Sequence, residues 1–261
     1  TEAIAAAAAA LPAWKSRPAK ERSAILRRWF DLMIANADDL AAIMTAEQGK
    51  PLAEAKGEIV YAASFIEWFA EEAKRIYGDT IPSPQANSRL TVIRQPVGIT
   101  AAITPWNFPL GLPCMYYLGP AVATGNTVVW VPAPTTSLIA VALMECMIDA
   151  GLPDGVINLV LGDGAEVGDE AVVHPGTHAI GFTGSSQTGN IIARRGAGKP
   201  LLLEMGGNGP TIVLSDADID MAAAQIGSCC FRNARQSCTA TARVLAHKSV
   251  TDRFVEGPAK A

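Results

Sequence analysis

The stretch VGITAAITPWNFPLGLPCMYYLGPAVATGNTVVWV at residues 97–131 decides the fold. It opens with a short β-rich run at 97–103, continues through a helix-length segment near 111–123 and returns to a β-rich run at 126–131. A strand, a helix and a second strand in this order are typical of parallel strands joined by a crossover helix. The polar and aromatic residues after the first run should then lie beyond the carboxyl end of a strand, where ligands bind in such sheets.

The same alternation continues to about residue 214. Further β-rich runs occupy 156–160, 178–182, 201–204 and 211–214, and the helix-length segments between most of them lie near 136–150, 164–173 and 187–198. This pattern predicts an α/β fold with a largely parallel sheet that helices cover on both faces.

The N-terminal part of the chain has a helical pattern instead. Ser16 is a candidate N-cap for a helix with Pro18 in its first turn, and Gly49-Lys-Pro51 breaks that helix. Its apolar residues recur with a helical period at Ile25, Trp29, Leu32, Met33, Leu40 and Ile43. A second helix is predicted at about 51–77, with Gly78 as its C′ glycine. Residues 81–88 indicate a loop, and residues 89–95 alternate like an exposed strand.

Composition excludes several classes of protein. The 261 residues are 49% apolar and 18% charged, which is typical of a globular chain with a sizeable core. The net charge of −4 gives no basic surface for nucleic acid. No apolar run reaches the roughly 18 residues of a membrane span, and the alanine-rich residues 3–10 lack the charged leader of a signal peptide.

The cysteines and histidines predict neither disulfides nor a metal site. Five cysteines without CxxC spacing and three scattered histidines fit a reducing environment, and we expect a cytoplasmic protein. Cys229 and Cys230 lie in an apolar, helix-like run, where a cysteine is usually a small buried hydrophobic residue.

Cys238 and Glu204 are candidate reacting groups. Cys238 ends the polar segment FRNARQSC at 231–238, which is a poor core environment, and a cation such as Arg235 favours a thiolate. Glu204 lies in LEMGGN at 203–208, at the end of a β-rich run and beside glycines that let a ligand approach the backbone. A thiol nucleophile and a carboxylate base can form and then hydrolyse a thioester, although a solvated turn is the commonest place for a glutamate.

Two further segments add a polar donor and a glycine-rich loop. Asn107 follows the β-rich run at 97–103, and its amide can donate to an oxyanion, although a plain turn residue is the simpler interpretation. Residues 181–189 read GFTGSSQTG, a strand running into a helix whose N-terminus could bind phosphate. Asn190 stands where the lysine of a P-loop would be, and no GxGxxG occurs, so this loop alone is weak support for a nucleotide site.

Together these segments resemble the NAD(P)-dependent aldehyde dehydrogenases over nearly the whole chain. In chain order, the motifs are PWNFP (105–109), GPAVATGNTVV (119–129), AGLPDGVINLVLGDG (150–164), FTGS (182–185), LEMGGN (203–208), FRNARQSC (231–238) and the trailing Arg243-Val-Leu. The resemblance implies a Rossmann-like doubly wound parallel sheet with N-terminal helices and an oligomerisation strand. The implied domains are 1–79, the helical part of the cofactor domain; 80–97, an oligomerisation arm; 98–230, the NAD(P)-binding domain; and 231–261, the start of a catalytic domain.

The resemblance also implies roles for individual residues. Cys238 would attack the aldehyde carbon, and Asn107 with the backbone N–H of Cys238 would hold the oxyanion. Glu204 would activate the water that releases the acid after hydride has passed to NAD or NADP. The residues that would line the cofactor are Ile103, Thr104, Pro105, Trp106, Gly164, Gly168, Phe182, Thr183, Gly184, Ser185 and Met205. Possible pocket walls for the aldehyde are Met115, Tyr116 and Phe231.

Some positions depart from the family pattern. Val131 and Pro134 replace a lysine and an acidic residue near the adenine ribose, which leaves the choice between NAD and NADP open. Tyr117 replaces a lysine, and Arg235 replaces a glycine before the glutamine of the nucleophile turn. A family member is roughly twice as long as this chain, so we expect a fragment or truncated form that lacks most of the catalytic domain.

The expected partners are a small aldehyde and further copies of the chain in a homodimer or homotetramer, with neither nucleic acid nor membrane. Two alternatives remain. A non-catalytic relative could serve as a binding or assembly module, and the departures at Tyr117, Val131 and Pro134 motivate this hypothesis. A CoA-acylating dehydrogenase would pass the acyl group to a thiol, but a water-activating Glu204 would then have no role.

Overall fold

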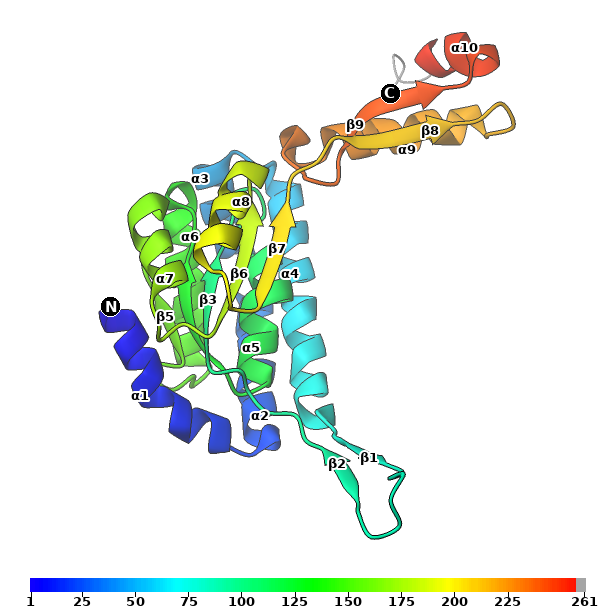
Figure 1. Cartoon of the computed structure of the whole chain (residues 1–261). Coiled ribbons are helices and arrows are strands. Elements are labelled where there is room, and N and C mark those ends of the chain that lie inside the picture. The colour runs from blue at the N-terminus through cyan, green and yellow to red at the C-terminus, as the bar shows by residue number, and fades with distance from the viewer. Residues whose placement is uncertain (257–261) are drawn as a thin grey trace. The chain divides into compact units, whose positions relative to one another are not determined.

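The computed structural model describes residues 1–256, and contacts within the chain divide it into two compact units. The first unit comprises Thr1–Thr183 and Gln187–Leu203, and the second comprises Gly184–Ser186 and the residues from Glu204 onward. Figure 1 labels most helices and strands of both units. None of the helices in residues 1–256 is long and apolar enough to cross a membrane.

A five-stranded sheet forms the centre of the first unit, with the strand order β5-β4-β3-β6-β7. Its strands are β3 (Ile99–Ile103), β4 (Thr127–Val131), β5 (Ile157–Leu159), β6 (Ala179–Gly184) and β7 (Leu201–Met205). β3 pairs in parallel with β4 and β6, and β4 pairs in parallel with β5. The α/β fold with a parallel sheet that the sequence predicts is therefore confirmed.

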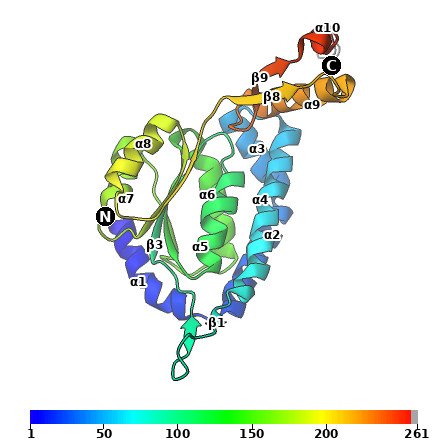
Figure 2. The ribbon, with the colours of Figure 1, turned by 45° about the vertical axis from the view of Figure 1, so that its right-hand side comes forward.

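One face of the sheet is covered by α1 (Glu2–Ser16), α7 (Asp169–Val173) and α8 (Ser186–Arg195). Successive side chains of a strand point to opposite faces. Ile99 and Ala101 are two residues apart in β3 and therefore lie on the same face. Ile99 packs with Ile4 of α1, and Ala101 belongs to a buried cluster with Val172 of α7 and Ile192 of α8. Figure 2 shows these helices on one side of the sheet.

The opposite face carries the largest core. Ala102 of β3 and Trp130 of β4 share it with Trp29, Val122 and Leu143. These residues come from α2 (Ala19–Ala35), α5 (Gly119–Ala123) and α6 (Ser137–Asp149), and the same layer includes α3 (Ala37–Gln48) and α4 (Leu52–Glu72). A π-helix, η2 (Pro113–Leu118), leads into α5, η3 (Pro134–Thr136) precedes α6, and η4 (Gly164–Gly168) precedes α7.

The predicted helix after Ser16 is wrong in its start and its continuity. Ser16 is the last residue of α1 and its hydroxyl donates to the Ala13 carbonyl, so it cannot cap α2. Pro18 is itself the N-cap of α2. α2 and α3 are separate because Asn36 ends α2 and bonds back to the Leu32 carbonyl.

The two glycine predictions have different outcomes. Gly49 ends α3 in the left-handed conformation with φ 79° and donates to the Thr45 carbonyl, so the predicted break is confirmed. Gly78 is not a C′ glycine, because α4 is followed by the 3-10 turn η1 (Ala73–Arg75) instead. A Cβ on Gly78 would lie 2.0 Å from the Val92 carbonyl oxygen, so the close approach of a strand requires glycine there.

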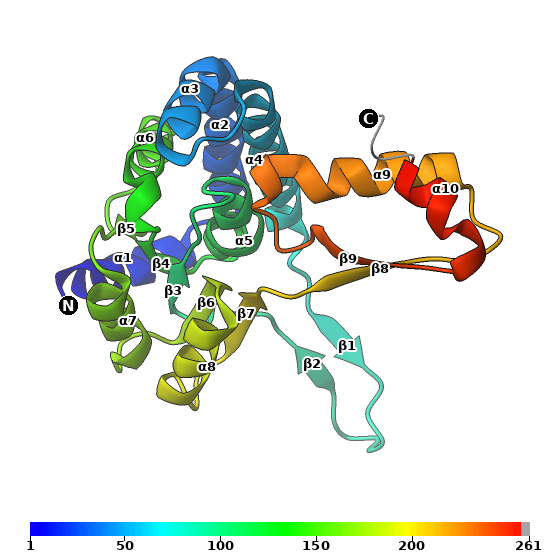
Figure 3. The same ribbon diagram turned by 90° about the horizontal axis from the view of Figure 1, so that it is seen from above.

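An exposed hairpin connects the helices to the sheet. β1 (Asp79–Ile81) pairs antiparallel with β2 (Leu90–Val92), and every residue of both strands is exposed. The predicted exposed strand is thus confirmed, and Figure 3 shows the hairpin extending away from the helices of the first unit.

The second unit has its own small sheet and core. β8 (Gly209–Val213) pairs in parallel with β9 (Thr241–Ala246). The remaining elements are α9 (Ile219–Phe231), η5 (Arg232–Arg235), η6 (Lys248–Val250) and α10 (Thr251–Glu256). Val213, Ile226 and Phe254 share the core. β8 and α9 belong to this unit together with β9. The domain bounds that the sequence resemblance implies stay a prediction, and residues 257–261 of the last predicted domain lie outside the described residues.

Candidate active site

The carboxyl edge of the sheet gathers part of the predicted cofactor site. Ile103 at the end of β3 lies in register with Val131 of β4 and with Phe182 of β6. A Cβ on Gly168 would lie 3.8 Å from Cδ1 of Ile103, so this buried glycine also belongs here. The structure therefore brings Ile103, Gly168 and Phe182 together, and Gly164 is exposed at the start of η4.

The turn after β3 is tied to the neighbouring strand. The amide of Thr104 donates to the Val131 carbonyl at 3.0 Å, and its buried hydroxyl accepts a bond from Nε1 of Trp130 at 2.9 Å. Pro105 is half-buried and Trp106 is exposed. The turn thus leaves the sheet with a fixed first residue and an accessible aromatic ring.

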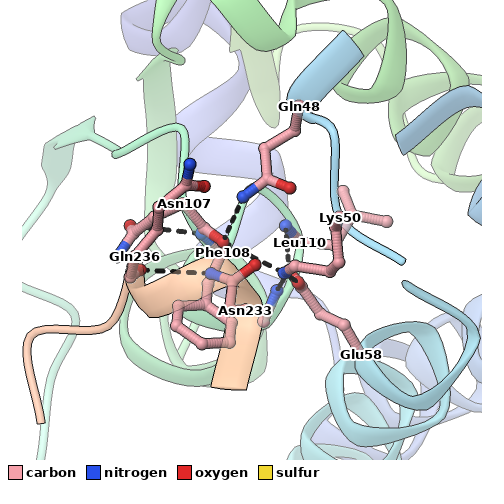
Figure 4. A network of polar contacts seen from close by, with 9 residues as sticks. Gln48, Lys50, Glu58, Asn107, Phe108, Leu110, Asn233 and Gln236 are labelled. Carbon is pink, nitrogen blue, oxygen red and sulfur yellow. Dashed lines mark hydrogen bonds and ion pairs between the residues drawn. The ribbon is translucent and has the colours of Figure 1, made fainter. Parts of the chain in front are cut away.

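Asn107 lies in this turn and is half-buried. Its side-chain oxygen accepts the N–H of the next residue, Phe108, at 3.1 Å. Its main-chain carbonyl accepts bonds from Nε2 of Gln48 at 3.2 Å and from Nζ of Lys50 at 3.0 Å. Figure 4 shows the side-chain amide of Asn107 pointing away from Lys50. This direction of the side chain is compatible with a donor role for the Asn107 amide nitrogen, which stays a prediction.

Sequence reasoning missed the side chains that hold this turn. Lys50 and Glu58 form a buried ion pair, and Oε1 of Glu58 accepts the N–H groups of Leu110 at 3.1 Å and Gly111 at 3.0 Å. The available signal was a lysine in the short break between two helices, at Gly49-Lys-Pro51.

The predicted phosphate loop has the geometry of an exposed helix N-terminus. β6 ends at Gly184, α8 begins at Ser186, and the first residues of α8 are exposed. The Ser186 hydroxyl donates to the Gly206 carbonyl at 3.3 Å, which places this loop beside the segment that carries Met205. Thr183 is buried instead, and its hydroxyl bonds the phenol of Tyr117.

Glu204 and Cys238 both belong to the second unit. Glu204 is the penultimate residue of β7 and is half-buried, and Cys238 lies in an exposed turn. The segments that carry them lead to the same end of the small sheet, where Gly209 of β8 lies opposite Thr241 of β9. The structure thus presents a carboxylate and an accessible thiol in the second unit, while Asn107 belongs to the first.

The residues before Cys238 have an unusual backbone. Asn233, Ala234 and Arg235 have φ values of 55°, 51° and 67°, which lie in the left-handed region. The turn is closed by a bond from the Gln236 amide to the Asn233 carbonyl at 2.9 Å and by one from Nδ2 of Asn233 to the Gln236 carbonyl at 3.1 Å (Figure 4). Arg235 therefore occupies a conformation that suits glycine better.

The structure also decides some lesser predictions. Cys230 is half-buried as expected, but Cys229 is exposed on α9, so its predicted burial is wrong because it faces away from the core of the second unit. Among the described residues no group of His, Cys, Asp and Glu side chains could hold a metal ion. Val131 is buried in β4, and Pro134 opens η3 with an exposed side chain.

A hollow of about 430 Å³ lies beside two of the predicted pocket walls. It is lined by Ser64, Phe65, Trp68 and Phe69 of α4 and by Met115 and Tyr116 of η2. Phe231, the third predicted wall, belongs to the second unit and is exposed. An apolar hollow of this kind can accept a carbon chain.

Comparison with known proteins identifies the family. The pattern of the aldehyde dehydrogenase family matches residues 1–261. The chain belongs to the aldehyde dehydrogenase family. The resemblance that the sequence motifs carry is therefore confirmed.

Individual aldehyde dehydrogenases match closely. The chain is 54% identical over 256 residues to the NADP(+) succinate-semialdehyde dehydrogenase of Escherichia coli strain K12, over 97% of this chain and 53% of that protein. It is also 54% identical to the glutarate-semialdehyde dehydrogenase of Pseudomonas putida, with the same coverage. The crystal structure of an E. coli NADP-dependent enzyme superposes with a TM-score of 0.97 at 53% identity, over 99% of this chain and 54% of that one. The chain spans about half the length of the curated relatives it matches.

Proposed function

We propose that the protein containing this chain oxidises an aldehyde to a carboxylic acid with NAD or NADP as the hydride acceptor. The observation that carries the proposal is the family match over residues 1–261, a range that includes the candidate thiol, carboxylate and amide. The accessible thiol of Cys238 and the half-buried carboxylate of Glu204 support it, because the two steps need a nucleophile and a base.

In the proposed reaction the Cys238 thiolate forms a C–S bond to the aldehyde carbon while the carbonyl electron pair moves to oxygen. The Asn107 amide and the main-chain N–H of Cys238 donate hydrogen bonds to that oxyanion. The nicotinamide, when bound, accepts the hydride from the same carbon. Glu204 then takes a proton from water, the water oxygen attacks the thioester, and the C–S bond breaks to release the acid and restore the thiolate.

The residues present fit a dinucleotide. The carboxyl edge at Ile103 and Phe182 lies at the ligand-binding end of a parallel sheet, and the first residues of α8 are exposed at a helix N-terminus, which is a favourable place for a phosphate. We therefore propose that the cofactor is held by the predicted residues at Ile103–Trp106, Gly164, Gly168, Phe182–Ser185 and Met205. Measuring the Kd of NAD and the Kd of NADP tests which of the two cofactors the protein prefers.

We propose a semialdehyde with a terminal carboxylate as the substrate. The relatives at 54% identity are dehydrogenases of succinate semialdehyde and glutarate semialdehyde, which supports this substrate class. The test is to compare kcat/KM for these two aldehydes with kcat/KM for uncharged aldehydes of equal chain length. Equal values would contradict a carboxylate preference and leave aldehyde oxidation intact.

The central test uses purified protein and the appearance of reduced nicotinamide. Cys238→Ala should abolish it, and Cys229→Ala, which changes another exposed cysteine, should not. Glu204→Gln should give a single burst of reduced cofactor and little turnover, because thioester hydrolysis then lacks its base. If Cys238→Ala kept the wild-type rate, or if the acyl group appeared only on CoA, the proposal would be wrong.

We propose that the β1–β2 hairpin joins copies of the chain in a homodimer or homotetramer. Exposed apolar side chains at Ile81, Leu90 and Val92 support this, since an exposed strand edge readily pairs with another chain. Light scattering should show a smaller particle for Leu90→Asp than for wild type, and an unchanged mass would contradict the proposal. The cytoplasmic compartment stays a prediction.

A further inference from the structure

Lys50 is a lysine in an unusual place. It lies in the short turn between α3 and α4, after the left-handed Gly49, and is only 2% exposed. Lysine is rarely buried to this extent, because its ammonium group loses its hydration unless other groups replace the water. The groups around Lys50 should therefore explain its position.

Those groups belong to one helix and one turn. Glu58 of α4, which is also buried, forms the ion pair with Lys50. The same ammonium nitrogen donates to the Asn107 carbonyl at 3.0 Å and lies 4.3 Å from the centre of the Phe108 ring (Figure 4). The hydrogen bond and the positive charge of Lys50 therefore act on the turn that carries Asn107.

Glu58 holds the other side of the same turn. Its Oε1 accepts the N–H groups of Leu110 and Gly111, where the helical segment leading into η2 begins. These N–H groups have no partner within a helix, and a carboxylate satisfies them and interacts favourably with the helix dipole. The pair thus fixes the chain on both sides of Phe108 and Pro109.

We propose that Lys50 and Glu58 are positioning residues for the Asn107 side chain, an inference that rests on the proposed function. An oxyanion donor works only when it is preorganised, and a displacement of about 1 Å can lower a rate by about 100-fold. An apolar pair could fill the same space and is often equally stable, but it could not bond the Asn107 carbonyl or the Leu110 and Gly111 amides. The buried charges therefore orient the turn.

A purely structural role for Lys50 and Glu58 predicts a different result from a positioning role. If Lys50 and Glu58 served only to hold α3 and α4 together, removing them would affect folding whatever residue stands at position 107. If they act through Asn107, their effect on kcat should disappear once the amide of Asn107 is absent.

The experiment replaces both charges together, because a lone buried charge could prevent folding. Lys50→Met with Glu58→Gln keeps an amide oxygen for Leu110 and Gly111 and removes the ammonium from Asn107. The matched control is Lys56→Met with Asp38→Asn, an exposed ion pair that joins α3 and α4. Each pair is made in the wild-type protein and in Asn107→Ala, and kcat for aldehyde oxidation and the Kd of the cofactor are measured.

We expect the buried double variant to lower kcat between about tenfold and about 100-fold with little change in cofactor Kd, and the exposed one to change neither. In Asn107→Ala the buried double variant should cause no further loss of kcat. A wild-type kcat in the buried variant, or an equal loss in both backgrounds, would overturn the proposal.

A second measurement separates this proposal from the proposed function. Amide hydrogen exchange of the peptide spanning 107–111 should be faster in the buried double variant than in wild type and unchanged in the exposed control. Unchanged exchange would overturn the positioning role. If the wild-type protein oxidised no aldehyde, the proposed function would fail, and the exchange result alone would decide whether the pair orders the turn.

Discussion

The phenol oxygen of Tyr117 lies 2.5 Å from the hydroxyl oxygen of Thr183, and both side chains are buried. Tyr117 belongs to η2 and Thr183 to β6, so the bond joins a helical layer to the strand whose end carries the FTGS loop. The bond gives the buried threonine hydroxyl a neutral hydrogen-bond partner.

Tyr117→Phe should lower the free energy of unfolding by about 1–3 kcal/mol, because it leaves the buried Thr183 hydroxyl without this partner. Urea denaturation measures the change. Tyr77→Phe is the matched control, since Tyr77 is 69% exposed and its loss of a hydroxyl should cost less than about 0.5 kcal/mol. Equal stability of the two variants would contradict a structural role for the bond.

Gly181→Ala should destabilise the first unit by about 1–3 kcal/mol, the range typical of overpacking. A Cβ at this position would lie 2.4 Å from Cδ1 of the buried Tyr117 ring, a contact that the packed ring cannot relieve cheaply. Gly57→Ala is a control of opposite sign. Gly57 lies in α4 with nothing within 4 Å of a Cβ, so alanine there should stabilise the helix by about 0.5–1 kcal/mol.

Alternation of β-rich and helix-length segments was sufficient to predict the sheet. The run from Val97 to Val131 became β3, the helical segment leading through η2 and α5, and β4, and the candidate Asn107 lies in the turn where the pattern put it. This works because a strand buried on both faces and its crossover helix have distinct local patterns.

Other features depend on contacts that a local pattern cannot show. The burial of Lys50 and Glu58 contradicts the usual preference of both residue types for water, so only the fold places them beneath the Asn107 turn. β8 has the same strand pattern as the five strands of the first sheet, yet it pairs with β9 because strand propensity does not specify a partner. The left-handed backbone at Ala234 and Arg235 likewise does not follow from their own residue types, which seldom adopt it.

Arg235→Gly should raise the free energy of unfolding by about 1 kcal/mol, because φ at this residue is 67° and glycine adopts that value without a Cβ clash. Ala234→Gly, at φ 51°, should change stability in the same direction. Arg232→Gly is the contrasting control, since φ at this residue is −52°, a value that relieves no Cβ clash when glycine replaces arginine, so this variant should not be stabilised. A destabilised Arg235→Gly would show that the arginine side chain contributes more than its backbone strain costs.

Four of the five cysteines should separate into two groups on labelling with iodoacetamide near neutral pH. Burial raises the pKa of the Cys114 thiol well above its usual value, with the charge of Glu58 adding to the effect, and burial also raises the pKa of Cys146. These thiols should stay unmodified in the folded protein, while Cys229 and Cys238 are exposed and accessible. Peptide mass spectrometry measures each site. Labelling of Cys114 at the rate of Cys229 would contradict the described core, and labelling in urea is the control for intrinsic reactivity.

The raised pKa of Cys114 should also make stability fall at high pH. The folded state keeps the thiol proton to a higher pH than the unfolded state, whose thiol titrates near about pH 8.5. The contribution is therefore fully present below that value and is lost by up to about 1.4 kcal/mol per pH unit above it, until the folded thiol also ionises. The measurement is the free energy of unfolding in urea for wild type and Cys114→Ala at about pH 7 and about pH 10. Because tyrosines and lysines titrate in both proteins, only the difference between the two proteins reports on Cys114. That difference should shift against the wild type as the pH rises, whereas the same difference at both pH values would mean that the thiol proton is not held by the folded core.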